Sequence, residues 1–163
     1  MIRDRIREYM TLKQKLSEDL KDALKKKDEV RVSSLRMVLA AVANKEIEIR
    51  KKDIGLSDEE VLEVLLSEVK KRKDSVTEFK KGGREDLVAR EEAELSALKG
   101  YLPAEMPDEE IARIVRDGIR ECGAEGMSDF GKVMKVIMPV LKGRADGDRV
   151  SAMVREALAS FKK

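Results

Sequence analysis

The chain has 163 residues, of which 42% are apolar and 42% are charged, and its formal net charge is +2. This length allows one medium domain or two small ones, and so balanced a charge does not by itself indicate a nucleic-acid binder. Aromatic residues make up only 3%, with no tryptophan, which disfavours strand-rich folds. The chain has enough apolar residues for a core and an unusually high share of charged residues. This combination favours an all-α protein of amphipathic helices.

The sequence also indicates a soluble, cytoplasmic protein. Its single cysteine, Cys122, leaves no internal disulfide and fits a reducing compartment. Residues 1–10 are charged throughout, unlike a signal peptide, and no apolar run approaches the ~20 residues that cross a bilayer. We interpret residues 1–10 as an N-terminal extension, with either Met1 or Met10 as the native start.

In chain order, the first predicted helix opens at a capping box, Thr11–Gln14, in which the two side chains satisfy otherwise unpaired backbone amides. Leucines then recur at every fourth residue, which predicts one buried face. These positions are Leu12, Leu16, Leu20 and Leu24. A second helix is expected over residues 30–50.

A third helix is predicted to begin at another capping box, Ser57–Glu60. It should end at Gly82–Gly83, because glycine is poor in helix propensity. A fourth helix is expected over residues 84–99. We expect these four helices to pack antiparallel, joined by short loops, as an N-terminal domain over residues 11–102.

Two prolines, Pro103 and Pro107, predict a stiff boundary after this domain. Beyond it we expect a three-helix C-terminal domain over residues 103–163, small enough to be marginally stable alone. Its helices are predicted over residues 108–122, 128–141 and 147–161. Residues that suit an N-cap stand at the three starts, namely Asp108, Ser128 and Asp146.

Residues that usually carry catalysis or hold metals are scarce. The sequence has no histidine, the commonest general base near neutral pH and the commonest metal ligand. It also has no cysteine cluster for zinc and no glycine-rich phosphate loop. Cys122 stands among apolar neighbours as a small core residue, and acidic runs such as Asp58–Glu60 suit a first helical turn. We therefore expect no catalytic residue, no metal and no cofactor.

The charges are unevenly distributed in the C-terminal domain. Residues 126–163 hold eight basic and four acidic residues, a net charge of +4, whereas residues 107–125 hold three basic and six acidic residues, a net charge of −3. This asymmetry offers one basic face to a polyanion. We interpret the basic run Lys70–Lys73 as a solvated face, because a helix points its four side chains in different directions.

The sharpest candidate site lies within residues 126–147. Lys132 and Lys135 stand opposite a predicted apolar stripe, and Lys142–Arg144 form a basic turn before a helix start whose amides suit a phosphate. Alternatively, this is a glycine C-cap with cations favoured near a helix end. The candidate nucleic-acid-binding residues are Gly131, Lys132, Lys135, Lys142, Gly143, Arg144 and Arg149. With so few aromatic residues for stacking, binding should follow RNA backbone and shape.

Several short motifs of this chain together resemble those of a known protein family. The most specific are Asp129–Met134 and Lys142–Gly147. Others are Leu35-Arg36, Asn44–Glu48, Arg72–Ser75, Gly83–Asp86 and Tyr101–Pro103. With these motifs the chain resembles the YqeY family from Thr11 to Ser160.

The resemblance implies an all-helical fold in two parts. It also implies that the C-terminal module is similar to the tail of GatB, the tRNA-binding subunit of glutamyl/aspartyl-tRNA amidotransferase. The contacts carried over by position are Gly131, Lys132, Lys142, Gly143 and Arg144. Family members often have a small residue where this chain has Lys135. The chain has no counterpart of that subunit's catalytic cradle, so the resemblance implies kinship and not amidation chemistry.

Three functional hypotheses follow. The first is an accessory tRNA-binding protein, non-catalytic by itself, with a possible protein partner in tRNA aminoacylation or amidation. The second is a helical protein-interaction adaptor without RNA, whose N-terminal bundle presents a groove to its partner. The third is a carbon–nitrogen ligase with glutamine as amide donor, for which the sequence offers no ammonia-releasing nucleophile.

Overall fold

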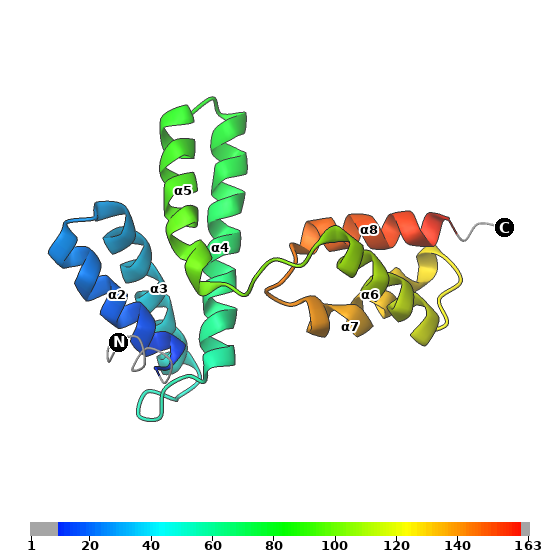
Figure 1. Ribbon diagram of the computed structural model, residues 1–163, viewed down its shortest axis with the longest axis horizontal. Coiled ribbons are helices and arrows are strands. Elements are labelled where there is room, and N and C mark those ends of the chain that lie inside the picture. The colour runs from blue at the N-terminus through cyan, green and yellow to red at the C-terminus, as the bar shows by residue number, and fades with distance from the viewer. Residues whose placement is uncertain (1–9, 161–163) are drawn as a thin grey trace. The chain divides into compact units, whose positions relative to one another are not determined.

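The computed structural model describes residues 10–160, and every regular element in that part of the chain is helical (Figure 1). The predicted all-α fold is confirmed. The chain divides between Leu102 and Pro103 into an N-terminal and a C-terminal unit, each with its own apolar core. Apart from Met10, the predicted extension lies outside the described residues. Within residues 10–160, no helix is both long and apolar enough to cross a membrane.

The N-terminal unit consists of two helical hairpins, α2–α3 and α4–α5 (Figure 1). Its elements are α2 (Leu12–Lys26), α3 (Glu29–Glu48), α4 (Asp58–Lys81), α5 (Glu85–Leu98) and the 3₁₀ turn η1 (Lys99–Tyr101). Both predicted capping boxes are confirmed. The hydroxyl group of Thr11 accepts a hydrogen bond from the amide of Gln14, and that of Ser57 accepts one from the amide of Glu60, both at 3.2 Å.

The core of this unit is apolar and draws on all four helices and η1. Its buried members are Leu16, Leu35, Val38, Val42, Val61, Leu65, Val69, Leu98 and Tyr101. The prediction that Leu24 is buried is wrong, because its side chain is 46% exposed and Ala23 is buried instead. A step of four residues overshoots one helical turn by about 40°, so a repeated four-residue spacing drifts off the buried face.

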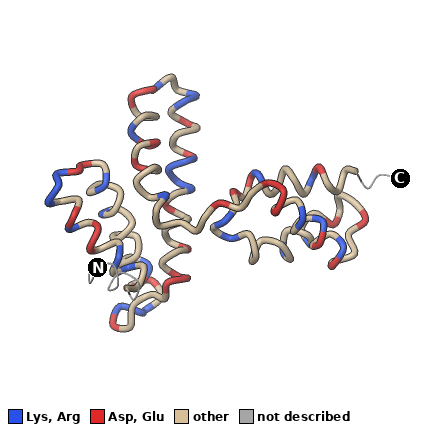
Figure 2. The backbone as a smooth tube through the Cα atoms, in the orientation of Figure 1, with Lys and Arg blue, Asp and Glu red and all other residues tan. Residues whose placement is uncertain are grey.

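An ionic cluster lies between α4 and α5. The guanidinium group of Arg72 is ion-paired with the carboxylates of Glu94 and Glu91, the latter at 3.0 Å. Arg72 and Glu94 are only 5% and 4% exposed. The prediction that Lys70–Lys73 form a solvated face is therefore wrong for Arg72, because these acidic partners on α5 compensate its burial. Along the chain, α4 carries a basic run at Lys70–Lys73, whereas α5 carries more acidic than basic residues (Figure 2).

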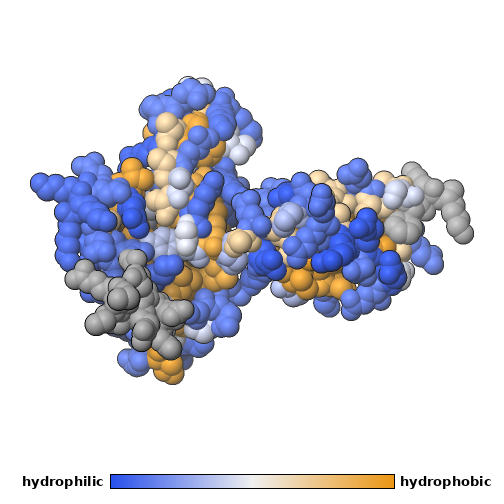
Figure 3. Space-filling view, viewed as in Figure 1, coloured by the Kyte–Doolittle hydropathy of each residue, from blue (hydrophilic) through white to orange (hydrophobic). Residues whose placement is uncertain are grey.

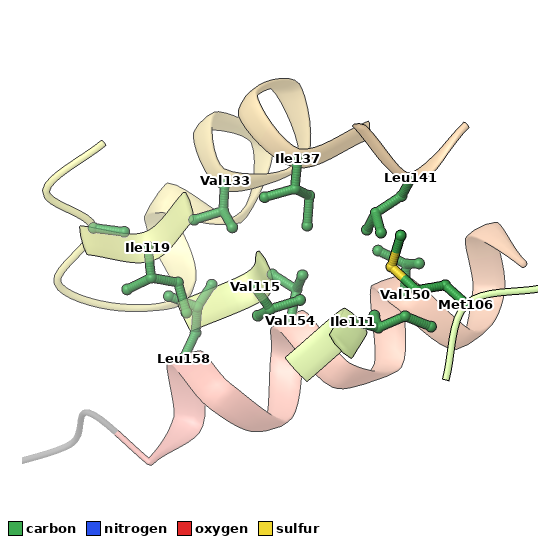
Figure 4. Packing of buried hydrophobic residues seen from close by; sticks show 11 residues of the cluster. Met106, Ile111, Val115, Ile119, Val133, Ile137, Leu141, Val150, Val154 and Leu158 are labelled. Atoms are coloured by element: carbon green, nitrogen blue, oxygen red, sulfur yellow. The ribbon is translucent and has the colours of Figure 1, made fainter. Parts of the chain in front are cut away.

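The C-terminal unit packs three helices around one core (Figure 4). Its elements are α6 (Asp108–Glu121), the 3₁₀ turn η2 (Met127–Asp129), α7 (Phe130–Leu141) and α8 (Gly147–Ala159). The core is lined by buried residues on the facing sides of these helices, namely Ile111, Val115, Ile119, Val133, Ile137, Leu141, Val150, Val154 and Leu158, together with Met106 from the segment before α6. Ile137 of α7 packs against α6 at Gly118, where a Cβ atom would lie 2.3 Å from Cγ2 of Ile137.

One of the three N-caps predicted in this unit is confirmed. Asp146 caps α8 by accepting a hydrogen bond from the amide of Asp148 at 3.0 Å. The prediction for Asp108 is wrong, since Pro107 holds the extended backbone of the cap and Asp108 is the first helical residue. The prediction for Ser128 is also wrong, because that residue lies inside η2 and α7 begins only at Phe130.

Candidate nucleic-acid interface

The outward side of α7 is built by its helical period. Val133, Ile137 and Leu141 are buried, so the residues about half a turn away face solvent. Lys132 and Lys135 lie on this outward side, and Lys142 continues it seven residues beyond Lys135. All three side chains are exposed, and α7 itself contains no acidic residue. The charged residues of this helix are thus all cations, and they lie on its solvent side.

Lys132 is bonded to an acidic neighbour from η2. Its ammonium group donates to the carboxylate of Asp129 at 2.7 Å, and that carboxylate also accepts a hydrogen bond from the amide of Glu125 at 3.1 Å. The bond to Asp129 raises the pKa of Lys132, and the same bond lowers the pKa of Asp129. Lys132 therefore stays charged at neutral pH, but its field is partly offset by Asp129. Beside it, Gly131 is exposed with open space around its Cα atom.

Arg149 forms an ion pair within the C-terminal unit. Its Nε atom donates to Oδ1 of Asp108 at 2.5 Å, and a second nitrogen contacts the same oxygen. This bond joins α8 to the first turn of α6 across 41 positions of the sequence. Arg149 is half-buried, so this predicted nucleic-acid contact is at least partly engaged in holding the two helices together.

The turn between α7 and α8 has a fixed backbone. Gly143 adopts φ +75°, a left-handed conformation that side-chain-bearing residues rarely adopt. The carbonyl oxygen of Arg144 accepts a hydrogen bond from the amide of the buried Met106 at 2.7 Å. The side chain of Arg144 is exposed and forms no ion pair with any residue between 10 and 160. The fold therefore holds this guanidinium group at the surface on a rigid turn.

The start of α8 is less suited to a phosphate than its sequence suggests. The carboxylate of Asp146 already accepts the hydrogen bond of the Asp148 amide. This negative charge occupies the position at which a helix N-terminus attracts anions. Candidate phosphate contacts are thus concentrated on α7 and on the turn that follows it.

Sequence reasoning missed a second group of cations, on α6. Arg113, Arg116 and Arg120 are exposed and lie on the side opposite the buried Ile111, Val115 and Ile119. None of the three arginines is ion-paired with a described residue. They were missed because residues 107–125 carry a net charge of −3. Their spacing of three and four residues nevertheless places them on one face of the helix. That spacing is the signal that identifies them.

Other chemically active groups are few in the described part of the chain. The thiol of the half-buried Cys122 donates to the carbonyl oxygen of Ile119 at 3.7 Å, as a residue that closes a helix end does. Among residues 10–160, no group of three or more cysteine, aspartate or glutamate side chains is arranged to hold a metal ion. The site thus offers charge and shape.

Comparison with known proteins places the chain in a family. Residues 13–158 match the family described as "Yqey-like protein". A protein of Pyrenophora tritici-repentis, named "Altered inheritance of mitochondria protein 41, mitochondrial", is 31% identical over 150 residues, which cover 90% of this chain and 80% of that protein.

Two yeast proteins of the same name are more similar over shorter stretches. Those of Kluyveromyces lactis and Lachancea thermotolerans are each 42% identical, over 105 and 95 residues. These stretches cover 62% and 58% of this chain, and 55% and 49% of the relatives. The chain thus spans about half the length of these two relatives. From the family match over residues 13–158, the chain belongs to the YqeY family.

Proposed function

We propose that this protein is an accessory tRNA-binding protein, related to tRNA-dependent amidotransferase and non-catalytic by itself. The observation that carries the proposal is the outward side of α7, where Lys132 and Lys135 are exposed and Lys142, the residue after the helix, continues the same side. Arg144 extends these cations onto the next turn. We call this surface, Lys132, Lys135, Lys142 and Arg144, the α7 basic surface.

The contact that we propose is to the RNA backbone. Lysine and arginine side chains neutralise phosphates without reading sequence, and they position a protein on a folded RNA. The aromatic residues described are Phe79, Tyr101 and Phe130, each buried or half-buried, so none of them offers an open stacking platform. A folded RNA with a dense phosphate surface suits such a binder better than an extended single strand does.

The amidotransferase relation and the choice of tRNA rest on the resemblance of the C-terminal module. The printed names of the fungal relatives refer to mitochondria and do not mention RNA. The proposal therefore keeps three further elements as predictions: tRNA as the RNA, a protein partner in tRNA aminoacylation or amidation, and a cytoplasmic location. Sequencing of RNA that co-purifies with the native protein tests the first of them directly.

A titration of tRNA at several salt concentrations tests the proposal. Binding to phosphates should weaken linearly in a log–log plot, with a slope of about −0.7 to −0.9 per contact. Reversing one charge of the α7 basic surface should reduce the slope by about one. Lys135→Glu should have a larger effect than Lys132→Glu, because Asp129 already offsets Lys132. Binding that does not depend on salt, or no binding at low salt, would contradict the proposal.

A second candidate is a protein-interaction adaptor, favoured by the surface of the N-terminal unit. An open groove of about 600 Å³ runs between α3 and α4, and its lining combines the apolar Ala41, Ile49 and Val64 with six charged residues. In the same unit, Ile47 and Ile54 are 61% and 87% exposed, and Figure 3 shows apolar surface on this unit among hydrophilic residues. Apolar side chains of this size on a surface often mark protein contacts.

Crosslinking in cell lysate followed by RNase treatment separates the two candidates. Partners that remain after RNase treatment support the adaptor, and partners that are lost support RNA binding. Ile54→Ser provides a matched variant, because it removes the most exposed large apolar side chain among residues 10–160 and leaves the C-terminal unit unchanged. Loss of a partner in this variant alone would assign that contact to the N-terminal unit.

A further inference from the structure

The outward side of α3 is poor in charge for a surface helix of this protein. Between residues 33 and 47 it exposes six residues, of which only one, Arg36, is charged. The other five are Met37, Ala40, Ala43, Asn44 and Ile47. By contrast, five of the seven exposed residues of the neighbouring α2 are charged. A helix that is apolar on its outward side as well as its inward side is normally covered on both, so this side of α3 suits a contact that its own unit does not supply.

The outward side of α3 continues into the groove between α3 and α4. Asn44 belongs to both, and Ala41 and Val64 line the groove beside it. The two helices run antiparallel (Figure 1), and the guanidinium group of Arg72 on α4 donates to the sulfur of Met37 on α3 at 3.1 Å. The six exposed residues of α3 and the lining of the groove therefore form one surface, which we call the α3 face.

The two ends of the α3 face carry opposite charges. Where α3 ends and α4 begins, three carboxylates and two cations give a net charge of −1: Glu48, Glu60, Glu63, Lys45 and Lys51. At the other end, Glu68 and Lys71 are bonded to each other at 2.6 Å. Arg36 adds a cation there that forms no ion pair with any residue between 10 and 160. This end therefore has a net charge of +1.

We propose that the α3 face binds the same face of a second copy of this chain, with the two α3 helices antiparallel about a twofold axis near Ala40. In a twofold contact of this kind, each end of the face meets the opposite end of its copy. The acidic end around Glu48 therefore meets Arg36 of the other copy, twice in each dimer. A partner of a single charge sign would be matched at one end alone, so the charge pattern favours a second copy over a foreign protein.

The shape and size of the α3 face suit a reversible dimer. Ala40 and Ala43 are small enough to let two helices approach closely, and Met37 and Ile47 on either side of them are 48% and 61% exposed. A face about 24 Å long and two helices wide covers roughly 500 Å² per copy, at the lower end of specific interfaces. We therefore expect a dissociation constant in the micromolar range. The inference goes beyond the proposed function, because it concerns the N-terminal unit and needs no RNA.

Sedimentation equilibrium of the full chain, freed of RNA, tests the dimer. Over a concentration range of about 1 to 200 μM, the average mass should rise from that of one chain towards twice that value. A mass that stays at that of one chain up to the highest concentration would overturn the proposal and leave the groove to the partner of an adaptor. Neither result depends on whether the protein binds tRNA, so this proposal and the proposed function can fail separately.

A pair of alanine variants tests which surface forms the dimer. Ala40→Arg places two guanidinium groups against each other at the twofold axis and should weaken self-association at least about tenfold. Ala93→Arg is the matched control, because Ala93 is exposed on α5 and does not line the groove. The control should change self-association less than twofold. An unchanged dimer in Ala40→Arg, or equal losses in both variants, would overturn the α3 face as the contact.

Charge reversals test the antiparallel arrangement. Arg36→Glu and Glu48→Arg should each weaken self-association about three- to tenfold, because like charges then meet at both ends of the contact. An equimolar mixture of the two variants should associate more tightly than either variant alone, since each reversed charge then faces its opposite. Lys25→Glu, on the exposed side of α2, is the control and should have no effect. A mixture that associates no better than its components would overturn the antiparallel contact.

Discussion

Tyr101 ends the N-terminal unit with a buried hydroxyl group. This group donates a hydrogen bond to the carboxylate of Asp19 at 2.6 Å and lies 3.5 Å from a nitrogen of Arg31. Burial and the bond to Asp19 raise the pKa of Tyr101 to about 12. Because loss of the phenol proton would place two anions side by side, the folded protein holds this proton more tightly than an unfolded chain does.

This shift predicts a stability loss at high pH. Between pH 10 and 12 the folded protein keeps the tyrosine proton and the unfolded chain loses it, so the free energy of unfolding falls as pH rises, by about 2 kcal/mol. Tyr101→Phe should cost about 1 kcal/mol at pH 8, because Asp19 loses a donor, and should remove this part of the pH dependence. Urea denaturation of both proteins at pH 8, 10, 11 and 12 measures the difference. Parallel pH profiles would contradict the prediction.

Among the elements, α4 and α5 depend on the ionic cluster between them. Besides its two carboxylate partners, Arg72 donates to the sulfur of Met37 at 3.1 Å, and its Nε atom has no acceptor within the described chain. Ser33 donates to Glu94 at 3.2 Å. A buried ion pair of this kind is costly to break from one side, because the remaining charge stays buried.

The cluster predicts non-additive effects of substitution. Arg72→Met should lower the free energy of unfolding by about 3–5 kcal/mol, since Glu94 keeps its buried charge. The double variant Arg72→Met with Glu94→Gln should be more stable than Arg72→Met alone, because it removes a buried charge whose remaining ionic partner is the exposed Arg90, at 3.4 Å. Guanidinium denaturation of the single and double variants gives the coupling energy. Strictly additive losses would show that the two charges do not depend on each other.

The crossing of α6 and α7 depends on Gly118. Gly118→Ala brings a methyl group against the branched side chain of Ile137, and such overpacking costs about 1–3 kcal/mol, against a gain of about 1 kcal/mol in helix propensity. We expect a net loss of stability in the C-terminal unit. Gly131→Ala in α7 is the control, because open space surrounds that position and the change should stabilise the helix. Thermal unfolding of both variants measures the opposite signs.

Individual helices show which features of the fold are determined by local sequence. The sequence correctly predicted the two helix starts at which a hydroxyl residue is followed three positions later by Glu or Gln. Both hydrogen bonds of such a capping box lie within four residues, so local sequence is enough to predict them. The burial of Arg72 was missed because its partners lie 19 and 22 positions away on another helix. Ser128 was misassigned because a 3₁₀ turn precedes α7, and the two turns have similar sequence preferences.

For the whole molecule, the sequence located the α7 basic surface but not the bonds within it. Helical period alone puts Lys132 and Lys135 on the outward side. The ion pair of Lys132 with Asp129 spans only three positions, so spacing alone could have indicated it. Outside this surface, the pair of Arg149 with Asp108 joins two helices across 41 positions, which spacing does not specify. The arginines of α6 were overlooked because a charge summed along the chain ignores which side of the helix each residue occupies.

The two units also carry separate reporters of their folding. Cys122 is the single thiol of the chain and lies in the C-terminal unit, whereas Tyr101 packs in the core of the N-terminal unit. In Gly118→Ala, thiol labelling should speed up at temperatures where the absorbance of Tyr101 is unchanged, in a background with Tyr9→Phe. Simultaneous change of both signals would mean that the units unfold as one.

The bond between Asp129 and Lys132 has a consequence for how strongly this family member can hold a polyanion. The carboxylate of Asp129 offsets part of the positive charge of Lys132. The affinity of the α7 basic surface for a polyanion is therefore lower than it would be without this carboxylate. Asp129→Asn retains an oxygen that accepts hydrogen bonds but removes the charge, and we expect tRNA to bind severalfold more tightly with a steeper salt slope. Adding Lys132→Gln should cancel the gain. A variant that binds more weakly than the unmodified protein would show that Asp129 organises the surface instead of restraining it.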